Sequence, residues 1–186
     1  MMSYARPFPR QAQLELTART LARRHLLDFT TYTYRLYRPE PAHALIAQAL
    51  ERVLKGEVKR LMIFAPPQHG KTELVSVLFP PFWLAHRPEA PGILTSYGAD
   101  LAVGKNRQAR DVIDSTPFRK LFPEIRLRAD VSGKQYWQLD GHRGGMRAAG
   151  VGGPITGHPA VLGIIDDPFK SWRDAQSLSV RNLVWD

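Results

Sequence analysis

The stretch FAPPQHGKTELV, residues 64–75, contains a phosphate-binding pattern with one replacement. Gly70, Lys71 and Thr72 occupy the last three positions of the pattern G-x-x-x-x-G-K-[ST]. In that pattern, backbone N–H groups of a loop and of a helix N-terminus surround phosphate oxygens. Ala65 stands where the first glycine would be. The sequence therefore predicts a nucleotide site with a modified loop, and the alternative is a helix N-terminus that carries a lysine.

Two prolines, at positions 66 and 67, decide which part of the loop can bind phosphate. Proline has no N–H to donate, so we expect the phosphate cradle to begin after them. Proline also keeps the preceding residue extended, which lets Ala65 avoid the positive φ that glycine would permit. The expected nucleotide-binding residues are Gln68, His69, Gly70, Lys71 and Thr72.

Two adjacent carboxylates end the apolar run VLGIIDD, residues 161–167. A buried strand that ends in an acid is the Walker B arrangement, which delivers a carboxylate to the Mg²⁺ ion of a phosphate loop. We expect Thr72 and Asp166 to bind Mg²⁺, Lys71 to contact the β- and γ-phosphates of ATP, and Asp167 to orient or deprotonate the attacking water. The alternative for the two acids is a polar turn after a strand. The expected catalytic residues are Lys71, Asp166 and Asp167.

Helices and strands that alternate along the chain must position these residues. Short apolar runs predict three buried strands of a parallel sheet, at 60–65, 92–97 and 160–168. Helical periodicity or composition predicts helices at about 11–27, 42–57 and 99–115, and another from Lys71 that the prolines at 80 and 81 interrupt.

The segment between the two motifs adds further strands. Residues 134–150 alternate apolar and polar side chains around DGHRGG, which predicts a hairpin, and residues 150–159 form a glycine-rich loop. The expected class is α/β, with a mostly parallel sheet flanked by helices. Strands between the two motifs favour the additional-strand type of P-loop NTPase, which includes helicases and translocating motors, over small-molecule kinases.

Composition indicates a polyanionic partner. The 186 residues carry a formal net charge of +9 and contain no cysteine, which excludes disulfides and Cys-ligated metals. No secretory signal and no apolar run of membrane-spanning length is present in the sequence. We expect a cytoplasmic protein that binds nucleic acid and no membrane. Arginines that could contact a DNA backbone are Arg107, Arg110, Arg119, Arg126 and Arg128, although a solvated helix face explains the first two equally well.

Several motifs together resemble one family. RLMIFAPPQHGKTELVS, TSYGADLA, RQARDVIDSTPFRKLFP and GVGGPITGHPAVLGIIDDPFKSWRDAQS, in this order, are similar to the ATPase domain of the terminase large subunit, the DNA-packaging motor of tailed bacteriophages. The resemblance runs from about His43 to the end of the chain. It implies an ATP-driven translocase of double-stranded DNA that forms a ring. The family's partners are the small terminase subunit and the procapsid portal protein, in the bacterial host cytoplasm.

The chain also departs from this family. Gln68 stands where the loop often has an arginine, which would leave charge neutralisation at the γ-phosphate to Arg60, Arg147 or a neighbouring subunit. Asp167 is one methylene shorter than the glutamate of many related motors. The resemblance places an N-terminal helical segment at 1–40 and an ATPase core at 41–186. That core would lack its C-terminal strands, the coupling motif and the nuclease domain.

Two other functions remain open from the sequence. One is a helicase-like ATPase, although DDPF does not match the Asp-Glu-x-His/Asp box of the nearest helicases. The other is a non-catalytic remnant that retains nucleotide or DNA binding.

Overall fold

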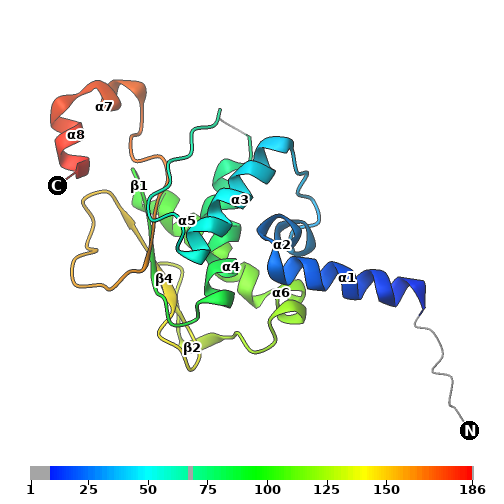
Figure 1. Cartoon of the computed structure of the whole chain (residues 1–186). Coiled ribbons are helices and arrows are strands. Elements are labelled where there is room, and N and C mark those ends of the chain that lie inside the picture. Colours follow the sequence, from blue (N-terminus) through cyan, green and yellow to red (C-terminus); the bar gives the residue numbers. More distant parts are fainter. Residues whose placement is uncertain (1–8, 67–68, 186) are drawn as a thin grey trace, which may run out of the picture.

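The computed structural model describes residues 9–66 and 69–185 (Figure 1). The helices in that part are α1 (Arg10–Arg24), α2 (Leu26–Thr33), α3 (Pro41–Lys55), the π-helix η1 (Glu73–Leu78), α4 (Phe79–His86), α5 (Ala99–Asp114), α6 (Thr116–Leu121), α7 (Trp172–Gln176) and α8 (Leu178–Trp185). The strands are β1 (Gly92–Ser96), β2 (Leu127–Ser132), β3 (Tyr136–Leu139), β4 (Gly145–Gly150) and β5 (Leu162–Ile165). Within the described residues, no helix has the length and hydropathy that a bilayer crossing requires.

The five strands of the described residues form one sheet in the order β2-β3-β4-β1-β5. Strand β1 pairs in parallel with β4 and β5, and β3 pairs antiparallel with both β4 and β2. The α/β class is confirmed, but the expectation of a mostly parallel sheet is wrong. The reason is the predicted hairpin, because strands joined by a short turn must run antiparallel. That hairpin is present, with Trp137 opposite Met146.

The predicted strand at 60–65 is absent. These residues form no strand in the structure, and the side chains of Met62 and Phe64 are 76% and 90% exposed. An apolar run becomes a strand only where a neighbouring strand accepts its backbone hydrogen bonds. Within residues 9–66 and 69–185 no strand lies beside this segment in the sheet. The segment is apolar, as its residues indicate, and the missing partner strand explains why it does not form a strand.

The helix that begins at Lys71 continues through Pro80 and Pro81. Helical structure begins at Lys71, widens into the π-helix η1, and continues as α4 with Pro80 and Pro81 in its first turn. The N–H of Phe79 donates to the carbonyl of Leu74, five residues earlier. Proline cannot donate to the preceding turn and its ring crowds the carbonyl four residues back. In a π-turn the backbone hydrogen bond runs to the carbonyl five residues back instead of four. The helix therefore continues through the prolines, and the prediction that they interrupt it is wrong.

One face of the sheet holds the core. Helix α5 packs on this face, where the buried strand residues include Leu94, Met146 and Ile164. Neighbouring residues that point to the other face, such as Gly163 and Ile165, are exposed. The sequence predicted strands buried on both faces of the sheet. In the structure, only the face that packs against α5 is fully covered.

Aromatic side chains join the N-terminal helices to this core. Phe29 of α2 lies with its ring centroid 5.3 Å from that of Phe82 and 6.0 Å from that of Phe118. All three are fully buried. Figure 1 shows these helices on the side of the molecule away from α7 and α8. The expected single helix at 11–27 is divided, because His25 between α1 and α2 has an extended backbone.

Candidate functional site

The helix that begins at Lys71 meets the two acids that follow β5. The Lys71 Nζ lies 3.1 Å from Asp167 Oδ1 in an ion pair. The Thr72 hydroxyl donates to Asp166 Oδ1 at 3.3 Å. The hydroxyl of Ser76, one helical turn further on, donates to Asp166 Oδ2 at 2.9 Å. The structure therefore brings together the four residues that the sequence singled out for catalysis and Mg²⁺ binding.

The backbone of the sheet fixes the two acids in place. The N–H of Asp166 donates to the carbonyl of Thr95 at 2.8 Å, and the N–H of Tyr97 donates to the carbonyl of Asp167 at 3.1 Å. These bonds extend the β1–β5 pairing beyond the strand ends. Ligands of parallel α/β sheets bind at the carboxyl ends of the strands, which is where both acids lie.

Asp167 has an uncommon backbone conformation. Its φ is +46°, and among the described residues it is the only non-glycine residue with a positive φ. Aspartate tolerates the left-handed region better than most residues, but the conformation still has an energetic cost. Strain of this kind is concentrated at functional sites, where the surrounding contacts maintain it. Here the ion pair with Lys71 and the hydrogen bond from Tyr97 hold Asp167 in that position.

Helix α3 contacts the loop through the side chain of His43. The N–H of Glu40 donates to Nδ1 of His43, so the neutral ring carries its proton on Nε2. That Nε2 lies 2.7 Å from the carbonyl oxygen of His69 and donates to it. Gly70 has φ +68°, and a Cβ built on it would lie 3.0 Å from His43 Nε2. The loop can approach His43 this closely only because residue 70 is glycine.

The hydroxyl of Tyr37 lies beside the same glycine. A Cβ on Gly70 would be 3.6 Å from it. The Tyr37 side chain is buried, and its hydroxyl has no hydrogen-bond partner in the part of the chain that the structure describes. Burial, together with the charges of Glu73 and Glu40, raises the pKa of Tyr37 to about 12. A buried polar group without a partner is uncommon and destabilises a fold.

Sequence reasoning did not identify Ser76, His43 or Tyr37. Ser76 could have been found, because it lies four residues after Thr72 and a helix places the two side chains on one face. His43 occupies the third position of α3, where its ring closes a capping box with Glu40. That local pattern predicts the cap but not the second bond to the loop, which joins residues far apart in sequence.

Not every predicted residue can be placed. Gln68 lies outside the described residues. His69 is exposed, and its carbonyl oxygen is bound by His43. Of the cations considered as replacements for the missing arginine, Arg60 is exposed in the segment before the loop. Arg147 stacks its guanidinium over the ring of Tyr136, at 4.4 Å from the centroid.

The oxygens of Thr72 and Asp166 fit a magnesium ion. Mg²⁺ prefers oxygen ligands in an octahedral arrangement with bonds of about 2.1 Å, so adjacent ligands lie roughly 3 Å apart. The measured 3.3 Å between Thr72 Oγ1 and Asp166 Oδ1 is close to this separation. One hydroxyl and one carboxylate, completed by water and phosphate oxygens, are the ligand set that phosphate loops supply.

A cavity of about 270 Å³ opens beside these residues. Its walls include Thr72, Asp166 and Asp167, together with residues from the end of β1 and from α5. A ligand bound between the helix after the loop and the two acids would therefore reach into it.

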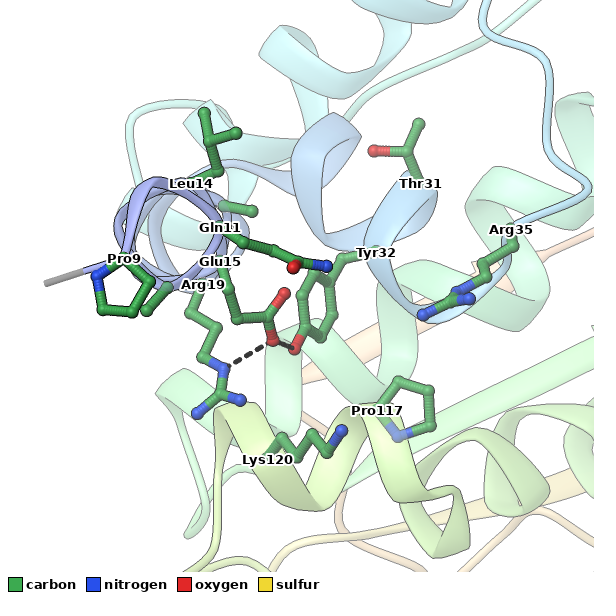
Figure 2. A pocket seen from close by; sticks show the side chains of 12 residues that line it. Pro9, Gln11, Leu14, Glu15, Arg19, Thr31, Tyr32, Arg35, Pro117 and Lys120 are labelled. Carbon is green, nitrogen blue, oxygen red and sulfur yellow. Dashed lines mark hydrogen bonds and ion pairs between the residues drawn. The ribbon is translucent and has the colours of Figure 1, made fainter.

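A second cavity, of about 800 Å³, lies between α1, α2 and α6 (Figure 2). The carboxylate of Glu15 in this cavity accepts hydrogen bonds from the Tyr32 hydroxyl at 2.7 Å and from Arg19 Nε at 2.8 Å. These two bonds, that from Tyr32 first, lower the pKa of Glu15. Gly70, Lys71 and Thr72 do not line this cavity, and neither do the two acids after β5.

Four of the five arginines proposed to contact DNA form ion pairs with acidic side chains. Arg107 and Arg110 both pair with Asp111, while Arg119 pairs with Asp114 and Arg128 with Asp130. Such exposed pairs are weak and can exchange for phosphate. They nevertheless reduce the net positive potential around these arginines.

No family model, no curated protein and no solved structure matches the chain. The geometry around Lys71, Thr72 and the two acids is therefore the observation on which a function can be proposed.

Proposed function

We propose that the chain binds Mg-ATP between the phosphate loop and the acids after β5, and hydrolyses it there. The observation that carries this proposal is the direct contact of two motifs far apart in sequence. Thr72 and Asp166 are separated by 94 positions, and Lys71 and Asp167 by 96, yet each pair is within hydrogen-bonding distance. A polar turn after a strand, or a helix N-terminus alone, would not require either contact.

The ion pair between Lys71 and Asp167 suggests how the site responds to a nucleotide. The β- and γ-phosphates offer the Lys71 ammonium several charged oxygens in place of one carboxylate. When Lys71 turns to them, the Asp167 carboxylate is released. It can then accept a proton from the attacking water, whose oxygen bonds to the γ-phosphorus as the bond to the bridging oxygen breaks. Water and ATP are thereby converted to ADP and phosphate.

Thr72 and Asp166 would hold the magnesium ion in this reaction. When bound, Mg²⁺ neutralises negative charge on the β- and γ-phosphate oxygens. Ser76 donates to the other oxygen of Asp166 and so keeps that carboxylate oriented toward Thr72. The chain would supply the Thr72 hydroxyl and the Asp166 carboxylate as ligands, and the backbone N–H groups at the start of the helix as phosphate donors.

We further propose that hydrolysis drives movement of double-stranded DNA, as in the ATPase domain of a terminase large subunit. The resemblance of the four motifs and the net charge of +9 support this. A ring of copies would act at a portal protein with a small terminase subunit, in the cytoplasm of a bacterial host. DNA contacts through phosphates would be independent of sequence and would weaken with salt.

Phosphate release from Mg-ATP tests the hydrolysis proposal. We expect turnover in the unmodified chain, loss of turnover with retained ATP binding in Asp167→Asn, and unchanged turnover in Asp140→Asn. Asparagine keeps the left-handed backbone accessible, so the first substitution removes the charge alone. Asp140 lies in the β3–β4 turn and is the matched control. Equal turnover in Asp167→Asn and the unmodified chain would show that Asp167 is not the base.

Duplex DNA in the same assay tests the second proposal. We expect DNA of any sequence to raise turnover at low salt, with the stimulation disappearing as salt rises. Turnover that is unchanged by DNA at every salt concentration would contradict a DNA-driven motor.

A further inference from the structure

The cavity beside the two acids contains a lysine that no motif identified. Lys105 belongs to α5, and it lines the cavity together with Thr72, Asp166 and Asp167. Leu101 and Ala102, four and three residues earlier on the helix, line it as well. Residues at these spacings share one helix face, so the face of α5 that covers the carboxyl end of β1 carries Lys105.

Lys105 has no charged partner among the residues that the structure describes. The side chain is half-buried, and within residues 9–66 and 69–185 it forms neither an ion pair within 4 Å nor a side-chain hydrogen bond. Lys71, the other lysine near this site, is already paired with Asp167. Removing an ammonium group from water without a partner is unfavourable. A half-buried cation in this cavity without an ion-pair partner among the described residues is therefore suited to an anion that enters from outside.

The size of the cavity limits what that anion can be. Its volume of about 270 Å³ lies just below the range for ligand pockets, which begins near 300 Å³. A complete nucleotide would extend beyond it toward the loop. The cavity fits a compact, multiply charged group, and the end of a triphosphate chain held at Lys71 and Thr72 is such a group.

We propose that the Lys105 ammonium contacts the γ-phosphate of ATP, opposite Lys71. This inference rests on the proposed nucleotide site and adds a residue to it. Lys105 takes the part that the loop arginine would otherwise have. During hydrolysis it keeps its proton and stabilises the charge on the γ-phosphate oxygens, while Asp167 accepts the proton of the attacking water. ADP has no γ-phosphate, so Lys105 favours the triphosphate over the diphosphate.

Calorimetric titration with Mg-AMPPNP (a non-hydrolysable ATP analogue) and with Mg-ADP tests this role. Lys105→Met keeps the length of the side chain and removes its charge. We expect this variant to bind Mg-AMPPNP about tenfold or more weakly, since a charge-assisted contact is lost, while its affinity for Mg-ADP changes less than about twofold. Lys105→Arg should retain the preference for the triphosphate. Arg107→Met removes a cation from an exposed position on the same helix and should alter neither affinity.

The results distinguish this inference from the proposed function. If the unmodified chain binds Mg-AMPPNP and Lys105→Met lowers both affinities equally or neither, the nucleotide site stands and the role of Lys105 is wrong. If the folded, unmodified chain binds neither nucleotide, the proposed function and the role of Lys105 both fail. Circular dichroism of each variant establishes that it is folded.

Discussion

Two apolar regions of this molecule, similar in composition, have opposite environments. Phe29, Phe82 and Phe118 are fully buried between helices α2, α4 and α6. The segment 60–65 contains Met62 and Phe64, which are largely exposed, and Ile165 at the end of β5 is 68% exposed. The aromatic cluster has partners from several helices, whereas in the described residues neither 60–65 nor the outer edge of β5 has a strand beside it.

This difference shows what an apolar run does and does not specify. Hydrophobicity favours burial at roughly 25 cal/mol per Å² wherever a surface is available. A helix satisfies its backbone groups internally, so it needs only a surface to pack on. A strand also needs a neighbour for its hydrogen bonds. The candidate site joins the two regions along the chain. Segment 60–65 leads into the loop, and the helix that follows the loop contains Phe82 of the buried aromatic cluster.

Truncation of one phenylalanine in each region should give the largest contrast. Phe29→Ala leaves a cavity beside the rings of Phe82, Phe118 and Phe122 and should lower the free energy of unfolding by about 3–5 kcal/mol. Phe64→Ala removes an exposed ring and should change it by less than about 0.5 kcal/mol. Urea denaturation followed by circular dichroism measures both. A loss of several kcal/mol in Phe64→Ala would mean that the segment 60–65 is packed in solution.

Alanine at Gly70 tests whether the contact with His43 of α3 determines the position of the loop. The new Cβ would meet His43 and the residue would keep a positive φ, so we expect a loss of roughly 1–3 kcal/mol in unfolding free energy. Weaker nucleotide binding should accompany it. Gly104→Ala in α5 is the matched control, because a Cβ there meets nothing within 4 Å. Helix propensity predicts a gain of about 0.5–1 kcal/mol for this control. Equal effects of the two substitutions would contradict the tight approach of the loop to His43.

Removal of the Tyr37 hydroxyl should have a smaller effect that depends on pH. Near neutral pH, Tyr37→Phe should be neutral or slightly stabilising, because the hydroxyl has no described partner. The pKa of Tyr37 is raised from 10.0 to about 12 in the fold, which favours the neutral form. This contribution to stability is present below pH 10 and is lost as pH rises through 12. The unmodified chain should therefore lose more stability than Tyr37→Phe over this window, and identical pH profiles would contradict the burial of the hydroxyl.

The smallest effect is expected at the exposed Glu15–Tyr32 contact. Hydrogen bonds from Tyr32 and then Arg19 lower the pKa of Glu15 below its ordinary 4.5. A lowered pKa stabilises the fold above the unfolded-state pKa, and the contribution is lost as pH falls through the folded-state value. Tyr32→Phe removes the main cause, so the Tm of this variant should fall less between pH 6 and pH 3. A larger fall in Tyr32→Phe than in the unmodified chain would contradict this order of causes.

Local patterns predicted more of the site than of the fold. Lys71, Thr72, Asp166 and Asp167 follow from two short motifs, and the structure places them together. The hairpin, β1, α3 and α5 follow from the periodicity and composition of their own residues. The failed strand at 60–65 depends on a partner strand, which no local pattern encodes. Tyr37, His43 and Lys105 likewise reach the site through tertiary packing rather than through neighbours in sequence.

The most direct test of the central claim is a calorimetric titration of Mg-ATP into the unmodified chain and into Lys71→Ala and Asp166→Ala. The ammonium of Lys71 should contact phosphate directly, and such charged contacts contribute up to roughly 3 kcal/mol. We therefore predict one binding site, about a hundredfold weaker in Lys71→Ala, and affinity in Asp166→Ala that no longer depends on Mg²⁺. Equal affinity in Lys71→Ala and the unmodified chain, or a folded chain that binds no Mg-ATP, would contradict a nucleotide site at the junction of these two motifs.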